Sequence, residues 1–175
     1  PGKSAIGHVR YSTAGGNGLK NCQPIMVDYV RGSIAVAHNG NLVNALELRA
    51  DLEQRGSIFS TTSDTEVIIH LLARSQHDTL AERMVDALRQ IKGAFSLVFL
   101  TETRLVAVRD PSGFRPLALG KLDGAYVIAS ETCAFDLIEA EFIRELEPGE
   151  MIIIDQHGLK SSFPFEKIQP SPCIF

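Results

Sequence analysis

The chain has 175 residues, 45% hydrophobic and 22% charged, which predicts one globular domain and excludes a disordered or fibrous protein. Its 17 basic and 21 acidic residues give a net charge of -4, which disfavours nucleic acid as a partner, and no apolar run is long enough to cross a membrane. Three separated cysteines without a CxxC pair predict neither a disulfide framework nor a zinc site, and favour a reducing cytoplasm.

Extended segments dominate the first 40 residues. Short apolar runs predict strands at residues 4–9, 22–30 and 34–37. The first strand would bring Arg10 to its end, and a hairpin at Arg31-Gly32 would join the other two. Residues 38–41 (HNGN) predict a turn after the central strand, with Asn41 as the N-cap of the following helix.

Three helices are predicted between residues 42 and 92. The first continues from Leu42 and stops at Gly56, a typical C′ residue. The other two are expected to open with capping boxes, at residues 63–66 (SDTE) and 79–82 (TLAE).

From residue 93 onward, the apolar period is that of strands. Strands are predicted at residues 93–100, 104–110, 116–120, 125–130, 150–155 and 158–163, with a short helix at 132–138. The short connections predict antiparallel pairing, and the order of elements predicts an α+β domain whose two sheets carry helices on their outer faces. Residues 164–175 contain three prolines and are interpreted as the start of a linker.

Polar groups stand at the ends of three apolar elements: Arg10, Asn39-Gly40 and Asp64. Taken singly, Arg10 is typical of a surface salt bridge, Asn39-Gly40 of a turn, and Asp64 of a residue that interacts with a helix dipole. Taken together, they predict an amino-acid receptor. A guanidinium binds a carboxylate, a carboxylate binds an ammonium, and two preorganised N–H donors stabilise an oxyanion.

The motifs that contain these residues resemble a known family. GHVRYSTAG, AHNGNLVNA and TTSDTEVI occur in the order and spacing of the glutaminase domain of class II (N-terminal-nucleophile) glutamine amidotransferases. CQP, RDPSGFRPLALG and PCIF are most similar to the amidophosphoribosyltransferase branch of that family. Glucosamine-fructose-6-phosphate synthase shares the first three motifs.

This resemblance implies a four-layer αββα sandwich of the N-terminal-nucleophile hydrolase type, truncated at its N-terminus. Residues 1–163 would form a partial glutaminase domain, and residues 164–175 would begin the linker to a phosphoribosyltransferase domain.

The resemblance also implies roles for individual residues. Arg10, assisted by Thr13, would bind the α-carboxylate of glutamine, and Asp64 would bind its α-ammonium. Asn39, through its side-chain amide, and Gly40, through its backbone N–H, would form the oxyanion hole. Three further residues would support the pocket: Tyr11, His38 and Ser63.

The nucleophile of this family is an N-terminal cysteine whose own α-amino group acts as the base. This sequence starts with Pro1-Gly2-Lys3, so we expect a fragment that holds the substrate pocket without the attacking thiol. Cys22, in the CQP motif, is not expected to be catalytic.

In the intact protein, the implied function is hydrolysis of L-glutamine. The ammonia would convert phosphoribosyl pyrophosphate to 5-phosphoribosylamine in the first step of purine synthesis. The alternatives are a non-catalytic glutamine-binding or interaction module, the glutaminase of another class II amidotransferase, and a base at Pro1 as in tautomerases.

The expected partners are L-glutamine, the missing N-terminal segment and the phosphoribosyltransferase domain, in a cytoplasmic homo-oligomer without nucleic acid or membrane. No cofactor is expected within this chain. The intact enzyme would use Mg²⁺ and, in some members, a 4Fe–4S cluster, for which Cys173 would be one ligand.

Overall fold

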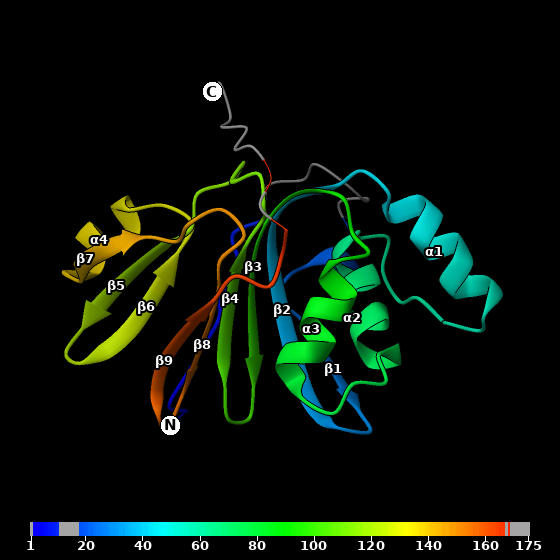
Figure 1. Ribbon diagram of the computed structural model, residues 1–175, viewed down its shortest axis with the longest axis horizontal. Coiled ribbons are helices and arrows are strands. Elements are labelled where there is room, and N and C mark those ends of the chain that lie inside the picture. The colour runs from blue at the N-terminus through cyan, green and yellow to red at the C-terminus, as the bar shows by residue number, and fades with distance from the viewer. Residues whose placement is uncertain (1, 11–17, 167, 169–175) are drawn as a thin grey trace.

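The computed structural model describes residues 2–10, 18–166 and 168, and in these residues it contains two antiparallel sheets, four α-helices and one short 3₁₀-helix (Figure 1). In chain order, the elements are η1 (Leu19–Asn21), β1 (Ile25–Tyr29), β2 (Gly32–Leu42), α1 (Ala45–Gln54), α2 (Thr65–Arg74), α3 (Leu80–Leu88), β3 (Gly93–Thr101), β4 (Leu105–Arg109), β5 (Ala118–Leu122), β6 (Ala125–Ala129), α4 (Cys133–Ile138), β7 (Glu141–Glu145), β8 (Met151–Asp155) and β9 (Gly158–Ser162).

The larger sheet has six strands in the order β1-β2-β3-β4-β8-β9, and α2 and α3 cover one of its faces (Figure 1). Strand residues that alternate along β2 and β3 point toward these helices, as a period of two requires. Val36 and Phe99 pack there with Ile68 of α2 and Met84 of α3, all at most 1% exposed. This cluster is the main core of the domain.

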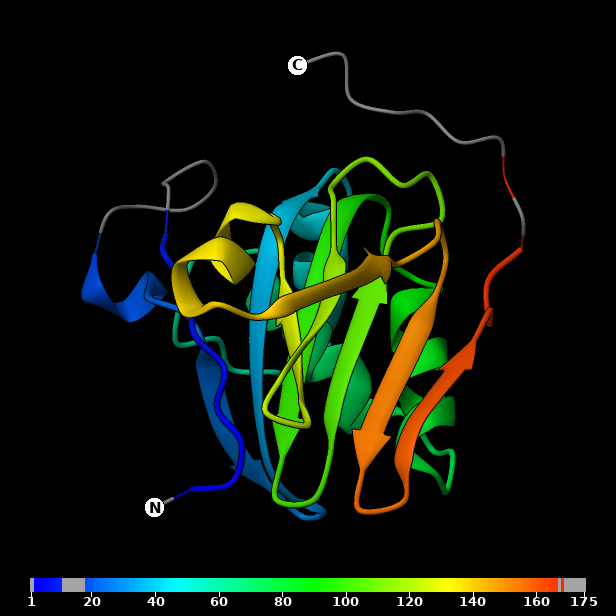
Figure 2. The ribbon, with the colours of Figure 1, turned by 90° about the vertical axis from the view of Figure 1, so that its left-hand side faces the viewer.

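A second, smaller core lies between the two sheets. The three-stranded sheet has the order β6-β5-β7, and its Leu119 packs with Ala107 and Ile152 of the larger sheet. The next residue, Gly120, faces the other way and lies against Phe135 of α4, where a Cβ would come within 3.1 Å of the ring. Helix α4 therefore covers the outer face, as Figure 2 shows, and the layers are those of the predicted four-layer sandwich.

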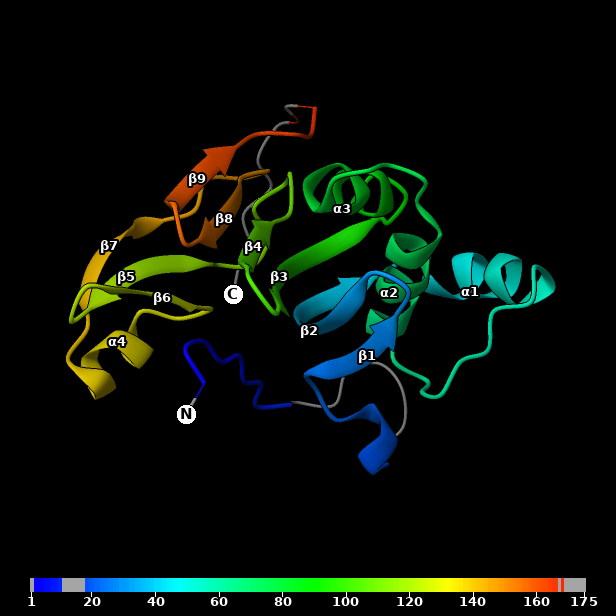
Figure 3. The same ribbon diagram turned by 90° about the horizontal axis from the view of Figure 1, so that it is seen from below.

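The predicted strand at residues 4–9 is wrong. These residues are not in a strand, because their backbone joins no sheet among the described residues. They cross the side of the larger sheet that faces away from α2 and α3, between α4 and β1 (Figure 3). The hairpin of β1 and β2 is as predicted.

The predicted turn at residues 38–41 is also wrong. β2 continues through these residues to Leu42, with Asn39 opposite Ser96 and Leu42 opposite Gly93 of β3. A partner strand of matching length keeps the Asn-Gly pair extended, so local turn preference is overridden. The N-cap of α1 is consequently Asn44 and not Asn41.

One of the two predicted capping boxes forms. Thr79 and Glu82 make the reciprocal bonds at the start of α3. At the start of α2, the Glu66 carboxylate instead accepts hydrogen bonds from the N–H groups of Ser60 and Thr61, 2.8 and 2.7 Å away. Strand β7 was not predicted, because four of its five residues are exposed and its sequence, EFIRE, lacks an apolar face.

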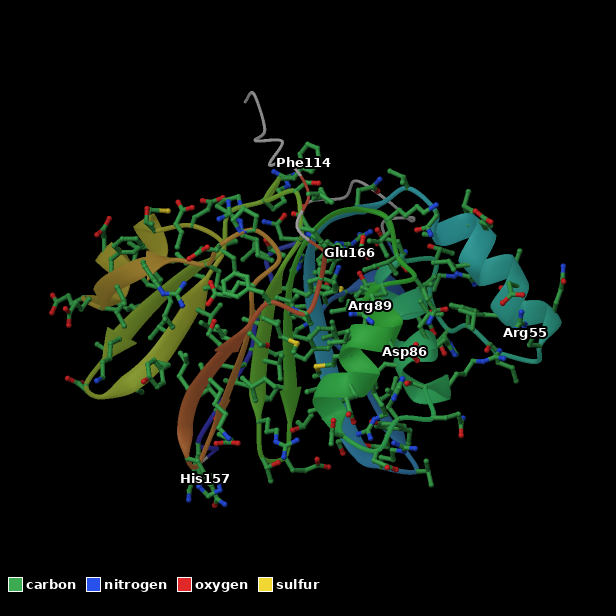
Figure 4. The ribbon with its side chains drawn as sticks, in the orientation of Figure 1. Arg55, Asp86, Arg89, Phe114, His157 and Glu166 are labelled. Carbon is green, nitrogen blue, oxygen red and sulfur yellow. The ribbon has the colours of Figure 1, made fainter. Side chains whose placement is uncertain are left out.

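Residues after β9 stay packed on the domain. The side chain of Arg89, the residue after α3, donates to the Pro164 carbonyl at 2.8 Å, and Phe165 packs against the main core. Figure 4 labels Arg89 and, from the segment after β9, Glu166. Within the described residues, none of the helices has both the length and the apolar character needed to span a bilayer.

Candidate functional site

A cavity of about 790 Å³ is lined by most of the predicted site residues. They come from the N-terminal segment, from β2 and from the loop before α2. The predicted residues that line it are Arg10, His38, Asn39, Gly40, Ser63 and Asp64. Tyr11 and Thr13 lie outside the described residues. Segments far apart in the sequence thus meet at one concave surface, large enough for an amino acid.

The geometry of β2 directs Asn39 and His38 to opposite faces of the sheet. Asn39 lies opposite Ser96, and both line the cavity together with Val98, on the face between the sheets. His38 points to the face covered by α2, where its Nδ1 is 3.3 Å from the Thr65 hydroxyl. Asn39 therefore faces the cavity between the sheets, whereas the His38 side chain is buried beside Thr65.

The backbone of β2 presents a row of N–H groups beside the cavity. On β3, the Phe95 carbonyl accepts from the Asp110 N–H, and the Phe95 N–H donates to the Asp110 carboxylate. Phe95 therefore exchanges no backbone hydrogen bond with Gly40, the residue opposite it on β2. By this alternation, the N–H groups of His38, Gly40 and Leu42 point away from β3. His38 donates to the Gln23 side chain at 2.7 Å, and Leu42 donates to Asp64 at 3.0 Å. The Gly40 N–H lies between these two donors on the same edge of β2, and Gly40 lines the cavity.

Only glycine fits at position 40. A Cβ there would collide with the Ala94 carbonyl and would lie 2.7 Å from Nε2 of His38. The bare backbone also lets a ligand oxygen come close to the N–H.

Asp64 is held in place before a ligand arrives. Its Oδ2 accepts from the Leu42 N–H, and its Oδ1 lies 3.8 Å from Nδ1 of His38. Burial disfavours the charged carboxylate, but the nearby His38 ring and the backbone N–H groups of Leu42 and Thr65 outweigh it and hold the pKa of Asp64 below its ordinary value. Asp64 is therefore ionised at neutral pH and can attract an ammonium group.

The segment that carries Arg10 is fixed to β2 through His8. The His8 Nε2–H donates to the His38 carbonyl at 3.0 Å. Burial lowers the pKa of His8, the bond to the carbonyl opposes this, and nearby His38 and Arg10 lower the pKa further. Because His8 is neutral at neutral pH, the charge at this end of the cavity is that of Arg10.

The structure adds residues that the sequence reasoning missed. Gln23 lines the cavity, and its side-chain oxygen accepts a hydrogen bond from the His38 N–H. Because Gln23 belongs to the CQP motif, that motif could have identified it as a site residue. Arg115, which lies in the RDPSGFRPLALG motif, also lines the cavity, as do Glu131 and Cys133, which lie in no motif of the resemblance.

Among the described residues, no group of three His, Cys, Asp or Glu side chains could hold a metal ion, and Cys22 and Cys133 are free thiols. Cys22 does not line the cavity, whereas Cys133 does. Cys173 lies outside the described residues.

Comparisons with known proteins identify relatives along the whole chain. The amidophosphoribosyltransferase 1 of Arabidopsis thaliana, a chloroplastic protein, is 57% identical over 176 residues, which cover 100% of this chain and 31% of that protein. The amidophosphoribosyltransferase of Bacillus subtilis is 52% identical and is covered to 36%. The chain thus spans about a third of the length of these relatives.

A solved structure agrees with the fold. The glutamine phosphoribosylpyrophosphate amidotransferase of B. subtilis, in complex with ADP and GMP, superposes with a TM-score of 0.89 at 48% identity, over 95% of this chain and 36% of that one. A family model described as a glutamine amidotransferase domain matches residues 8–136, which is more than half of the sequence. The chain therefore belongs to the glutamine amidotransferase domain family.

Proposed function

We propose that this chain is the glutaminase part of an amidophosphoribosyltransferase and that its cavity binds L-glutamine for hydrolysis to glutamate and ammonia. The observation that supports this proposal is the single cavity lined by Arg10, Asn39, Gly40 and Asp64. A cation, an anion and two N–H donors match the carboxylate, the ammonium and the side-chain amide of glutamine.

Each residue has a distinct part in the proposed reaction. Arg10 binds the α-carboxylate and Asp64 binds the α-ammonium, which orients the side-chain amide toward β2. When a thiolate attacks the amide carbon, the carbonyl oxygen becomes an oxyanion, and the Asn39 side chain and the Gly40 N–H donate to it. The C–N bond then breaks as the α-amino group of the N-terminal cysteine, which took the thiol proton, returns that proton to the leaving nitrogen. Ammonia is released, and water hydrolyses the thioester to glutamate and the free thiol.

The proposal extends to the protein that contains this chain. We propose that a segment outside this sequence supplies an N-terminal cysteine as the nucleophile. The ammonia would then serve to convert phosphoribosyl pyrophosphate to 5-phosphoribosylamine. The high identity to proteins named amidophosphoribosyltransferases supports this reading over another class II amidotransferase.

The test is a glutaminase assay on the full-length gene product. Glutamate and ammonia should form in equal amounts from L-glutamine. Arg10→Ala should raise the KM for glutamine by about 10- to 100-fold with a smaller change in kcat, because it removes a charged hydrogen bond to the substrate. Binding of glutamine without release of glutamate would instead support a non-catalytic binding module.

A further inference from the structure

The connection between β4 and β5, residues 110–117, is held in place by two charged side chains at its start. The Asp110 carboxylate is fully buried and accepts a hydrogen bond from the Phe114 N–H at 3.1 Å. The Arg109 guanidinium donates to the Arg115 carbonyl at 2.9 Å. The path of this connection is therefore fixed by the protein itself, before any ligand binds.

The same connection is tied to the strand that pairs with Asn39. The Ser96 hydroxyl of β3 donates to the carbonyls of Arg115 and Pro116, at 3.3 and 3.1 Å. Ser96 lies opposite Asn39 on β2, and Ser96, Asn39 and Arg115 all line the cavity. Arg115 therefore belongs to the end of the cavity at which the proposed function places the substrate amide.

The two arginines of this region differ in what their side chains bind. Arg109 donates to three backbone carbonyls and to the Glu145 carboxylate. Arg115 is exposed, and within residues 2–10 and 18–166 its guanidinium has neither a hydrogen bond nor an ion pair, although Glu131 lines the same cavity. The Arg115 charge is therefore available to a ligand.

The ground state of L-glutamine gives this second guanidinium no anionic partner. Glutamine carries one carboxylate, which the proposed function assigns to Arg10, and its side-chain amide is neutral. Negative charge develops at the amide end when the carbonyl oxygen becomes an oxyanion, and the product glutamate carries a γ-carboxylate there. A cation at this end interacts more strongly with the transition state and the product than with the substrate.

We propose that Arg115 is an anion-stabilising residue at the amide end of the cavity, where its guanidinium favours the oxyanion and the γ-carboxylate of glutamate over the neutral amide. This inference rests on the proposed function. The two cations of the cavity then have different parts. Arg10 binds the α-carboxylate, which substrate and product share, whereas Arg115 responds to the charge that the reaction creates.

The test measures glutamine hydrolysis, and its inhibition by L-glutamate, in the full-length gene product. Arg115→Gln should lower kcat about tenfold and raise the inhibition constant of glutamate about tenfold, because both charged states lose a partner. The KM for glutamine should stay within about twofold. Arg115→Lys keeps the charge, so all three constants should stay within about threefold of wild type.

Arg104→Gln is the matched control. Arg104 is exposed in the turn between β3 and β4 and does not line the cavity, so its loss should leave all three constants unchanged. Arg115→Gln is expected to fold, because the bonds that hold the connection use the carbonyl of residue 115, which every variant keeps. Should it not fold, Arg115→Met removes the same charge and carries the comparison.

Three outcomes would overturn the inference. Unchanged kcat and an unchanged inhibition constant of glutamate in Arg115→Gln refute it and leave the proposed function standing. An equal rise in the glutamine KM and the glutamate inhibition constant also refutes it, because Arg115 would then act on groups that both ligands share. A wild-type protein that does not hydrolyse glutamine removes the proposed function, and this inference with it.

Discussion

At the scale of single residues, Asn39 and Arg10 are expected to affect different kinetic constants. Asn39 lines the cavity and lies opposite Ser96 on β3, and in the proposed function its side-chain amide is an oxyanion donor. Loss of one such donor typically costs about 10²–10³ in kcat. Asn39→Ala should therefore lower kcat by about that factor in a glutaminase assay, with KM within a few fold.

Asn41 offers the matched control for this prediction. It has the same side chain, follows Asn39 by two residues on the same face of β2, and is exposed. Asn41→Ala should leave kcat unchanged. A large rise in KM with unchanged kcat in Asn39→Ala would mean that the amide binds the ground state and not the transition state.

The sequence identified the charged residues of the site more easily than the groups that hold them. Arg10 and Asp64 stand out because each is a charge at the end of an apolar run. The resemblance gave His38 as a supporting residue, but the partners of its ring and of the Gln23 amide could not be assigned, because Thr65 lies 27 positions from His38 and the His38 N–H lies 15 positions from Gln23. Such contacts depend on how the strands and helices pack, which a local pattern does not encode.

At the scale of elements, periodicity predicted the strands and helices, and local preferences misplaced some of their ends. The strands from β3 to β6 and the pair β8 and β9 lie where a period of two placed them. The turn predicted at residues 38–41 does not form, because β3 pairs with β2 through these residues as far as Gly93, opposite Leu42. The capping box predicted at residues 63–66 does not form, because the Glu66 carboxylate accepts instead from the N–H groups of Ser60 and Thr61 in the preceding loop.

The capping box of α3 yields a test that is separate from the site. The Thr79 hydroxyl accepts from the Glu82 N–H at 3.2 Å, and the Glu82 carboxylate accepts from the Thr79 N–H at 3.2 Å. Thr79→Ala should lower the free energy of unfolding by about 1 kcal/mol, measured by urea denaturation, because a helix N–H loses its partner.

The glutamine KM of Thr79→Ala should not change, since α3 does not line the cavity. Thr103→Ala, in the exposed turn between β3 and β4, is the control and should change stability by less than about 0.5 kcal/mol. Equal stability of the two variants would show that the box contributes nothing.

At the scale of the whole molecule, a buried carboxylate links the two sheets. Glu150, 1% exposed, accepts two hydrogen bonds from Arg144 of β7 at 2.7 Å each. It also accepts from the Ser161 hydroxyl of β9 and from the Glu147 N–H, at 2.6 and 2.8 Å. The smaller sheet is therefore held to the larger one by a fully bonded charge as well as by the second core.

This link predicts how stability depends on pH. Burial disfavours the charged form of Glu150, but the bonds from Arg144, Ser161 and Glu147 outweigh it and hold the pKa of Glu150 below its ordinary value of 4.5. A carboxyl whose pKa is lower in the folded state stabilises the fold above its unfolded pKa. That contribution is lost as the pH falls through the folded pKa.

Glu150→Gln should lower the free energy of unfolding by about 3 kcal/mol at neutral pH, because it removes the charge that Arg144, Ser161 and the Glu147 N–H share. The difference from wild type should stay constant down to about pH 5 and shrink below the ordinary pKa of the carboxyl. Asp51→Asn, which breaks the exposed pair with Arg55 at 2.8 Å, should cost less than about 1 kcal/mol. Urea denaturation across this pH range measures both, and a difference for Glu150→Gln that grows as the pH falls would contradict a lowered pKa.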